Sequence, residues 1–133
     1  MNKTKKTALL LTSMVFCYSL LAVIIEIPQD VIAGFKTGKA ESVSKYFKDS
    51  VELTINNNEN IYSSTQAELI LKDFFKKNQP KDFTIIHEGG KGESKYAIGN
   101  LTTANGNYRI TLLFKKSGNT TYIHQLRIEK DDV

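Results

Sequence analysis

The sequence predicts one α+β domain in which helices pack on one face of an antiparallel sheet. Apolar residues recur at helical spacing near the start of this domain and again around residue 70. From Pro80 onward the sequence changes to the two-residue alternation of strands, interrupted by turns that contain Gly or Asn. A chain of 133 residues has room for a single hydrophobic core, so we expect one domain at residues 28–133.

Residues 1–27 form a separate N-terminal region. Lysines precede a run without charge at residues 7–25, which is the pattern of a secretory signal peptide. We therefore expect export to the periplasm or the cell exterior. The run also approaches the roughly 20 residues that cross a bilayer, so an uncleaved membrane anchor at residues 8–25 stays open as the alternative.

The rest of the chain gives little support for nucleic-acid, metal or disulfide chemistry. Residues 28–133 hold 15 basic and 13 acidic residues, a balance that does not indicate nucleic acid. The single cysteine, Cys17, lies in the N-terminal region, so the domain has no thiol for a disulfide. With two histidines and no acidic cluster, we expect no metal and no cofactor.

Two short helices are expected in succession at residues 28–38 and 40–50. Pro28 suits a first helical position, and Gly38 suits a helix end. Their apolar faces consist of Val31, Ile32, Phe35, Val43, Tyr46 and Phe47.

A strand, a turn and a third helix are expected next. Residues 51–55 alternate apolar and polar side chains as a half-buried strand does, and the Asn-rich residues 56–60 read as a turn. Thr65 and Glu68 have the spacing of a capping box that opens the third helix. Its apolar stripe consists of Ala67, Ile70, Leu71, Phe74 and Phe75.

Four strands complete the domain as an antiparallel meander, at residues 82–88, 94–103, 107–116 and 121–130. Asn105-Gly106 is the preferred dipeptide of a two-residue hairpin turn, and it would pair Tyr108 with Thr103. A three-residue turn at 117–119 would pair Leu112 with His124.

This pairing predicts which side chains face the helices. The small residues Ala97 and Gly99 lie mid-strand on this inner face, where they either admit a helix closely or leave a hollow. A hollow would be a pocket for a small apolar ligand. The candidate pocket consists of His124, Tyr122, Tyr108, Ala97, Gly99 and Leu112.

The same pairing places apolar side chains on the outer face of the sheet. Ile98, Leu113 and Ile123 would form a row across three strands, with Tyr96 beside them. Arg109 and Arg127 would lie opposite one another, an unfavourable pair unless a carboxylate intervenes. We expect this outer face to form a homodimer or to contact a protein partner.

Several motifs resemble a known family. "FKTGKAESVSKYFKDSVELTI", "TQAELILKDFFKKN", "FTIIHEG", "YAIGNLTTANGNYRI" and "LRIEK" resemble a family of small secreted bacterial proteins of unknown function from the Bacteroidetes group. The resemblance covers nearly everything after Pro28. It implies the nuclear transport factor 2-like, or cystatin-like, cone fold, a curved sheet wrapped around about three helices. It implies no catalytic or binding residues, and the wider fold serves many functions.

Two functions follow as expectations. The first is an exported, non-enzymatic domain that binds a small apolar ligand in the cone or a protein on the outer sheet face. The alternative is a small lyase or isomerase that uses His124 as a general base with a pocket tyrosine. No carboxylate pair is expected inside the cone, and no residue is assigned a catalytic role. Contact with a membrane is expected only through an uncleaved N-terminal region.

Overall fold

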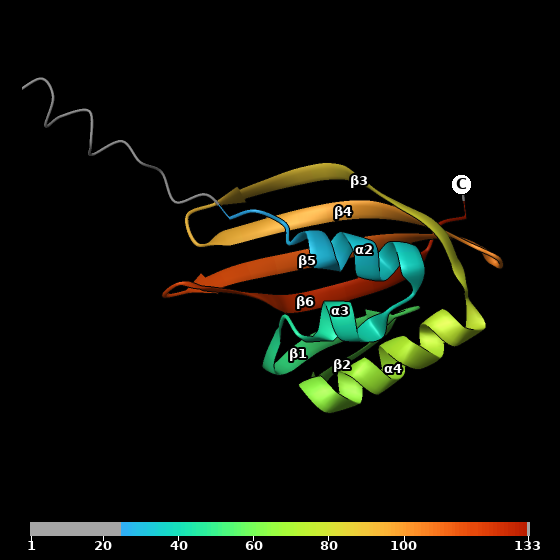
Figure 1. Ribbon diagram of the computed structural model, residues 1–133, viewed down its shortest axis with the longest axis horizontal. Coiled ribbons are helices and arrows are strands. Elements are labelled where there is room, and N and C mark those ends of the chain that lie inside the picture. Colours follow the sequence, from blue (N-terminus) through green and yellow to red (C-terminus); the bar gives the residue numbers. More distant parts are fainter. Residues whose placement is uncertain (1–24, 133) are drawn as a thin grey trace, which may run out of the picture.

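A curved six-stranded sheet carries helices on one face in the computed structural model of the protein, which describes residues 25–132 (Figure 1). The strands lie in the order β2-β1-β6-β5-β4-β3. In chain order the elements are α2 (Gln29–Thr37), α3 (Ala40–Ser44), β1 (Phe47–Ile55), β2 (Asn58–Ser63), α4 (Ser64–Lys77), β3 (Pro80–Lys91), β4 (Ser94–Thr103), β5 (Gly106–Ser117) and β6 (Thr120–Lys130). The predicted α+β class and the curved sheet around three helices are confirmed for these residues.

The sheet is antiparallel except at one pair of strands. β1 and β6 run parallel, with Leu53 beside Leu126, whereas every other neighbouring pair is antiparallel. The prediction of a fully antiparallel sheet is therefore wrong at this pair of strands. The parallel pair is made by the first and last strands of the sheet in chain order. The chain between them, which contains α4 and four strands, supplies the long connection that a parallel pair requires.

The two N-terminal helices follow the predicted order, although the second is shorter. Gly38 ends α2 with a positive φ of 71°, which glycine adopts without steric cost. α3 stops at Ser44, and β1 begins at Phe47, so the helix expected at 40–50 is wrong in its second half. Lys45 pairs with Asp30 and thereby joins the two helices, and its hydrogen bond and charge lower the pKa of Asp30.

The third helix is capped two residues earlier than the sequence predicts. The Ser63 hydroxyl accepts a hydrogen bond from the backbone N–H of Gln66 at 3.2 Å, and the Ser63 and Gln66 side chains are also 3.2 Å apart. The N-cap is therefore Ser63, and Thr65, the predicted cap, already lies within the first turn of α4.

One strand was absent from the prediction. The turn between β1 and β2 contains only Asn56 and Asn57, both at positive φ (47° and 72°), and Ile55 pairs with Asn58 directly after it. Two left-handed residues form the tight hairpin that matches strand twist, and Asn tolerates this conformation. Residues 58–60, expected in the turn, therefore belong to β2.

The turn between β5 and β6 is also shorter than expected, and a β-bulge compensates for it. Ser117 pairs with Thr120, so the loop has two residues and Gly118 takes a φ of 61°. This register turns Ile123 inward opposite Phe114. The register then shifts at His124, so that Leu126 and Ile128 still face the core as predicted.

The β4–β5 hairpin keeps its predicted faces with a register shifted by two residues. Thr103 pairs with Gly106, and Leu101, rather than Thr103, lies opposite Tyr108. The loop therefore consists of Ala104 and Asn105. A shift by two leaves every side chain on the same face.

The core fills the space between the inner face of the sheet and the helices. Phe83 of β3 packs against Phe35 of α2 with ring centroids 4.9 Å apart, and Phe35 meets Phe75 of α4 edge-on. Ile25 is also buried, at 5% exposure, and Lys95 donates a hydrogen bond to its carbonyl oxygen at 2.9 Å. The packed part of the chain thus includes residues ahead of Pro28.

The expected signal peptide or anchor lies almost entirely in residues 1–24, outside the described residues. Within residues 25–132 every helix is too short or too polar to cross a membrane.

Candidate functional site

The hollow expected over Ala97 and Gly99 is filled. Both residues face the helices as predicted, and Ala97 is fully buried. A Cβ added to Gly99 would lie 2.4 Å from an aromatic carbon of Phe83, so the ring of Phe83 occupies the space that the glycine leaves. Leu112 is buried at 1% exposure in the same packed region. These residues form core rather than a pocket.

Tyr108 also lies inside, in a structural role. Its ring packs edge-on against Phe74 with centroids 5.0 Å apart, and its hydroxyl donates to Asn78 Oδ1 at 3.0 Å. The tyrosine therefore joins β5 to the end of α4.

His124 and Tyr122 lie on the outer side of the sheet, contrary to the prediction. The two residues flank Ile123, whose side chain is fully buried, and both are half-exposed. Their rings are 6.5 Å apart, and Lys48 Nζ lies 5.1 Å from the centroid of Tyr122. The error arises from the two-residue turn and the bulge, which together exchange the faces of residues 122–124.

The outer face agrees with the prediction at Tyr96, Ile98 and Leu113. Tyr96 lies opposite Leu113 in the register, and its hydroxyl lies 3.1 Å from His87 Nε2. Ile123 is removed from this face. The predicted row is therefore replaced by a shorter group of three residues, which we call the outer apolar group.

The expected repulsion between Arg109 and Arg127 is also absent. Arg109 lies opposite Glu129, and Arg127 donates to Glu129 Oε1 at 2.8 Å. The register differs by two residues from the predicted one, so a carboxylate stands where a second guanidinium was expected. Both arginines remain on the outer face.

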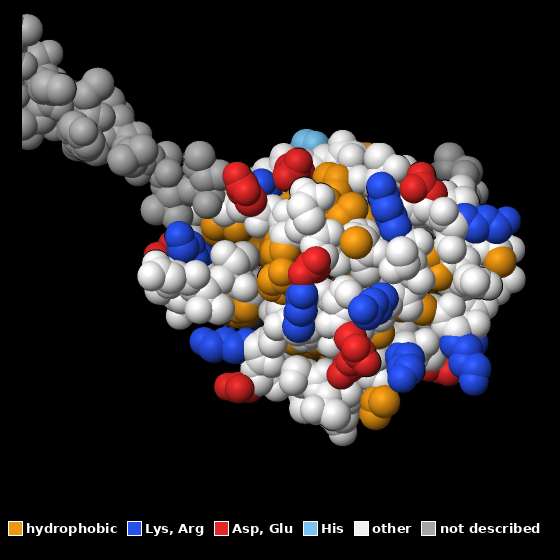
Figure 2. Space-filling view, viewed as in Figure 1, with side chains coloured by type: hydrophobic (Ala, Val, Ile, Leu, Met, Phe, Trp, Pro, Cys, Tyr) orange, Lys and Arg blue, Asp and Glu red, His pale blue; other side chains and the backbone are white. Residues whose placement is uncertain are grey.

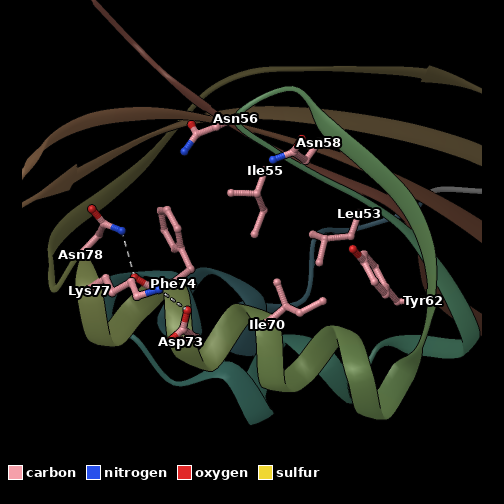
Figure 3. A pocket seen from close by; sticks show the side chains of 10 residues that line it. All are labelled: Leu53, Ile55, Asn56, Asn58, Tyr62, Ile70, Asp73, Phe74, Lys77 and Asn78. Carbon is pink, nitrogen blue, oxygen red and sulfur yellow. Dashed lines mark hydrogen bonds and ion pairs between the residues drawn. The ribbon is translucent and has the colours of Figure 1, made fainter.

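The structure instead has a cavity of about 390 Å³ between α4 and the β1–β2 hairpin (Figure 3). We call it the hairpin pocket. None of the six predicted pocket residues lines it. Its walls consist of Leu53, Ile55, Asn56, Asn58, Tyr62, Ile70, Asp73, Phe74, Lys77 and Asn78.

The floor of the hairpin pocket is apolar. Leu53 and Phe74 are buried, and Ile55, Tyr62 and Ile70 are partly buried against the same core. Figure 3 shows Ile55 pointing from the hairpin towards Ile70 and Phe74 on the helix. Asparagines and one lysine–aspartate pair lie around this floor, which is the usual composition of a site for a small organic molecule.

The charged groups with shifted pKa values lie away from this pocket. The pKa of Glu52 is raised, because its carboxyl shares a hydrogen bond with Glu59, is partly withdrawn from water and is near the charge of Glu59. Glu129 raises the pKa of Arg127 by a hydrogen bond and by its charge. Glu52 and Arg127 flank Thr54 on the outer side of the sheet, opposite the pocket.

Charge is dispersed over the helix-bearing face as well. Figure 2 shows Lys and Arg side chains interspersed with Asp and Glu across it. Among residues 25–132, no three His, Cys, Asp or Glu side chains are placed to hold a metal ion.

The pocket residues could be found only in part from the sequence. Ile70 and Phe74 were assigned correctly to the apolar stripe of the helix, and Leu53 and Ile55 to the inner face of the strand. Asn58 and Tyr62 were missed because β2 was not recognised. Its sequence, "NENIYS", alternates apolar and polar residues too weakly to predict a strand. The Asn56-Asn57 pair is the signal that would have found this hairpin.

Comparisons with known proteins agree with this fold. Residues 28–129 match the family described as "Domain of unknown function (DUF4783)". A crystal structure of a DUF4783 family protein from Bacteroides ovatus is 38% identical with a TM-score of 0.78, over 81% of this chain and 98% of that chain. No curated protein matches the chain.

More distant structures share the fold alone. A cystatin-like domain of unknown function from Nostoc punctiforme has a TM-score of 0.64 at 8% identity, over 79% of this chain and 73% of that chain. A protein named Rd1NTF2_04 with long sheet has a TM-score of 0.62 at 13% identity, over 75% of this chain and 94% of that chain. The nuclear transport factor 2-like, cystatin-like architecture is thus confirmed, whereas the activity is left open.

Proposed function

Since this chain belongs to the DUF4783 family, whose description names no activity, we propose from its geometry that it is an exported, non-enzymatic domain that binds a small, mainly apolar ligand in the hairpin pocket. The observation that carries this proposal is the cavity between α4 and the β1–β2 hairpin, whose lining includes the apolar side chains of Leu53, Ile70 and Phe74. A volume of about 390 Å³ falls within the range of small-molecule sites.

The placement of titratable groups supports binding over catalysis. An acid–base reaction needs a group with a suitable pKa within reach of the substrate. Asp73 and Lys77 are the charged residues of the pocket wall, and their side chains are well exposed and paired with each other at 2.9 Å. The alternative mechanism needs His124 inside the cone, and its ring lies on the other side of the sheet.

The N-terminal pattern of lysines followed by residues 7–25 supports export. Mass spectrometry of the protein isolated from its own cells distinguishes a cleaved, secreted chain from an uncleaved, membrane-anchored one. A processed chain that begins before Ile25 supports secretion, and an intact chain in the membrane fraction supports the anchor.

Ligand binding is tested with N-phenyl-1-naphthylamine, an uncharged dye that becomes fluorescent in apolar sites. The protein is used in the form in which it is isolated from its own cells. We expect the dye to bind with one site, and Ile70→Trp to abolish binding because the larger ring fills the pocket.

Leu69→Trp is the matched control, since Leu69 is the neighbouring residue of α4 and is 63% exposed. Circular dichroism checks that both variants are folded. Equal dye binding by both variants, or no binding by the natural protein, would contradict the proposal.

A second candidate function is contact with another protein copy through the outer apolar group. The observation that favours it is the adjacency of Tyr96, Ile98 and Leu113 on a face that none of the described helices covers (Figure 1). Sedimentation velocity over a range of concentrations tests it. We expect Leu113→Lys to reduce self-association, with Thr102→Lys on the same face as the control. A monomer at every concentration rules this function out.

A further inference from the structure

The polar groups of the hairpin pocket fall into two sets, and the first is already satisfied within the protein. Asn78 Nδ2 donates to the carbonyl oxygen of Phe74 at 3.1 Å, and Asn78 Oδ1 accepts from Tyr108 at 3.0 Å and from Asn105 at 3.4 Å. Lys77 is paired with Asp73 (Figure 3). This end of the pocket has little hydrogen-bonding capacity left for a ligand.

The second set lies at the β1–β2 hairpin, and its side chains are not hydrogen-bonded to other groups of the described residues. Among the hydrogen bonds of residues 25–132, none involves the side chains of Asn56, Asn58 or Tyr62. The backbone N–H of Asn56 donates to the carbonyl oxygen of Ile128 at 3.0 Å, which fixes the position of the turn. Figure 3 shows the Asn56 and Asn58 amides beside the pocket, across from α4.

Turn geometry explains only part of this arrangement. Asn56 and Asn57 both have positive φ, and Asn is favoured there whatever lies nearby. Asn58 is different, because it is a residue of β2 and needs no special backbone conformation. Asn57 makes the same turn but does not line the pocket. The amides of Asn56 and Asn58 are therefore the pocket groups that are left to hydrogen-bond a ligand.

The charge of the pocket restricts the ligand further. Its two charged wall residues are paired with each other, so neither sign is left unbalanced to receive an ion. A charged end group beside the exposed amides of Asn56 and Asn58 would lose part of its hydration without gaining an opposite charge, which is unfavourable. An uncharged polar group can exchange water for the amides at little cost.

We propose that the hairpin pocket binds an uncharged amphiphile. Its apolar body lies on Ile55, Ile70 and Phe74, and its hydroxyl, carbonyl or amide end group is hydrogen-bonded by Asn56 and Asn58. This inference rests on the proposed ligand-binding function and names the chemical class of the ligand.

The test uses three probes with the same alkyl chain: 1-octanol, octanoate and octylammonium. Each is titrated against the protein loaded with N-phenyl-1-naphthylamine, and displacement of the dye gives its affinity. We expect 1-octanol to bind about tenfold more tightly than either ion, because an ion gives up part of its hydration at the amides and finds no unpaired opposite charge on the pocket wall.

Two variants then test the amides. Asn58→Ala and Asn56→Gly each remove one amide, and glycine keeps the left-handed turn at position 56. We expect each to weaken 1-octanol binding by roughly three- to tenfold, the effect of one neutral hydrogen bond. Asn57→Gly is the matched control and should leave the affinity unchanged.

The outcomes separate the two proposals. If the dye binds and Ile70→Trp blocks it, but the ions compete as well as 1-octanol or the amide variants change nothing, the amphiphile inference is wrong and the binding function stands. If neither dye nor 1-octanol binds to the natural protein, both proposals fail.

Discussion

Gly99 shows how one residue can predict a cavity that its neighbours remove. The sequence correctly placed Gly99 on the inner face of β4, because strand alternation is a local property. It could not show that Phe83, from the edge strand β3, projects its ring over the glycine. Phe83 is itself held against Phe35 of α2, so three distant segments decide the outcome.

Gly99→Ala should therefore destabilise the fold. The new Cβ would lie 2.4 and 2.5 Å from two carbons of the Phe83 ring, which cannot move away without disturbing Phe35. We expect a loss of about 1–3 kcal/mol in the free energy of unfolding, measured by urea denaturation. Asn100→Ala, at the exposed neighbouring position, is the control and should change stability by less than about 0.5 kcal/mol. Equal values for the two variants would show that the ring moves freely.

A substitution at Thr54 should stabilise the fold, whereas the one at Gly99 should destabilise it. It is 2% exposed, and its hydroxyl is buried without a hydrogen-bond partner in the described part of the chain. Valine has nearly the same shape without the hydroxyl, so Thr54→Val removes an unsatisfied polar group. We expect about 1 kcal/mol of added stability, measured as a raised urea midpoint. A lower midpoint would indicate that an ordered water satisfies the hydroxyl.

At the scale of elements, the short β5–β6 turn and the bulge at His124 have opposite effects on the faces of β6. The turn alone would have reversed the faces of the whole of β6, and the bulge restores them before Leu126. The inward positions of Leu126 and Ile128 were therefore predicted correctly from a wrong register. Residues 121–124, which lie between the turn and the bulge, were assigned to the wrong faces. That local error moved His124 and Tyr122 into the predicted pocket and Ile123 out of the core.

The helices and the strand faces could be predicted because periodicity and caps are local, as at Gly38 in α2. The hairpin pocket could not, because it depends on where β2 packs against α4. Its Asn-Asn turn was read as part of a longer loop, and this hid both β2 and the amides of Asn56 and Asn58. Register and the packing of an edge strand depend on tertiary contacts, which a single sequence does not contain.

The contact between β1, β2 and β6 gives a prediction on pH. The raised pKa of Glu52 means that the folded state binds this proton more tightly than the unfolded state does. The corresponding stabilisation is present below the ordinary pKa of 4.5 and is lost as pH rises through the raised value. Glu52→Gln keeps a group that can accept the hydrogen bond from Gln125 Nε2 but cannot ionise. We expect Glu52→Gln to stabilise the protein more at pH 7 than at pH 4.

Urea midpoints of the natural protein and of Glu52→Gln at both pH values measure this difference. Glu129→Gln is not a neutral control, since Glu129 holds Arg127, so Glu68→Gln on α4 is used. An equal shift of Glu52→Gln at pH 4 and pH 7 would show that the carboxyl is not perturbed.

At the scale of the whole molecule, the N-terminal residues are tied to the far end of the β3–β4 hairpin. Lys95 donates to the Ile25 carbonyl oxygen at 2.9 Å and pairs with Glu88 at 3.0 Å, and its side chain is only 21% exposed. The segment that leads from the N-terminal region into α2 is therefore part of the packed domain.

Lys95→Met should loosen this segment, because the Ile25 carbonyl loses its charged donor. We expect a loss of about 1–2 kcal/mol in stability and faster proteolysis near residues 25–28. Lys91→Met, at an exposed position on the same hairpin, is the control and should match the natural protein. Unchanged proteolysis of Lys95→Met would show that Ile25 and Ile27 hold the segment by packing alone.

The place of β6 in the strand order determines when this protein can fold. β6 is the last of the described strands in chain order, and it is inserted between β1 and β5, so without it the other described strands form two separate groups. Contacts between residues 47–55 and 120–130 span most of the domain, and such distant pairings slow folding. The described sheet is therefore completed only when β6 is in place, and until then the facing edges of β1 and β5 both lie open.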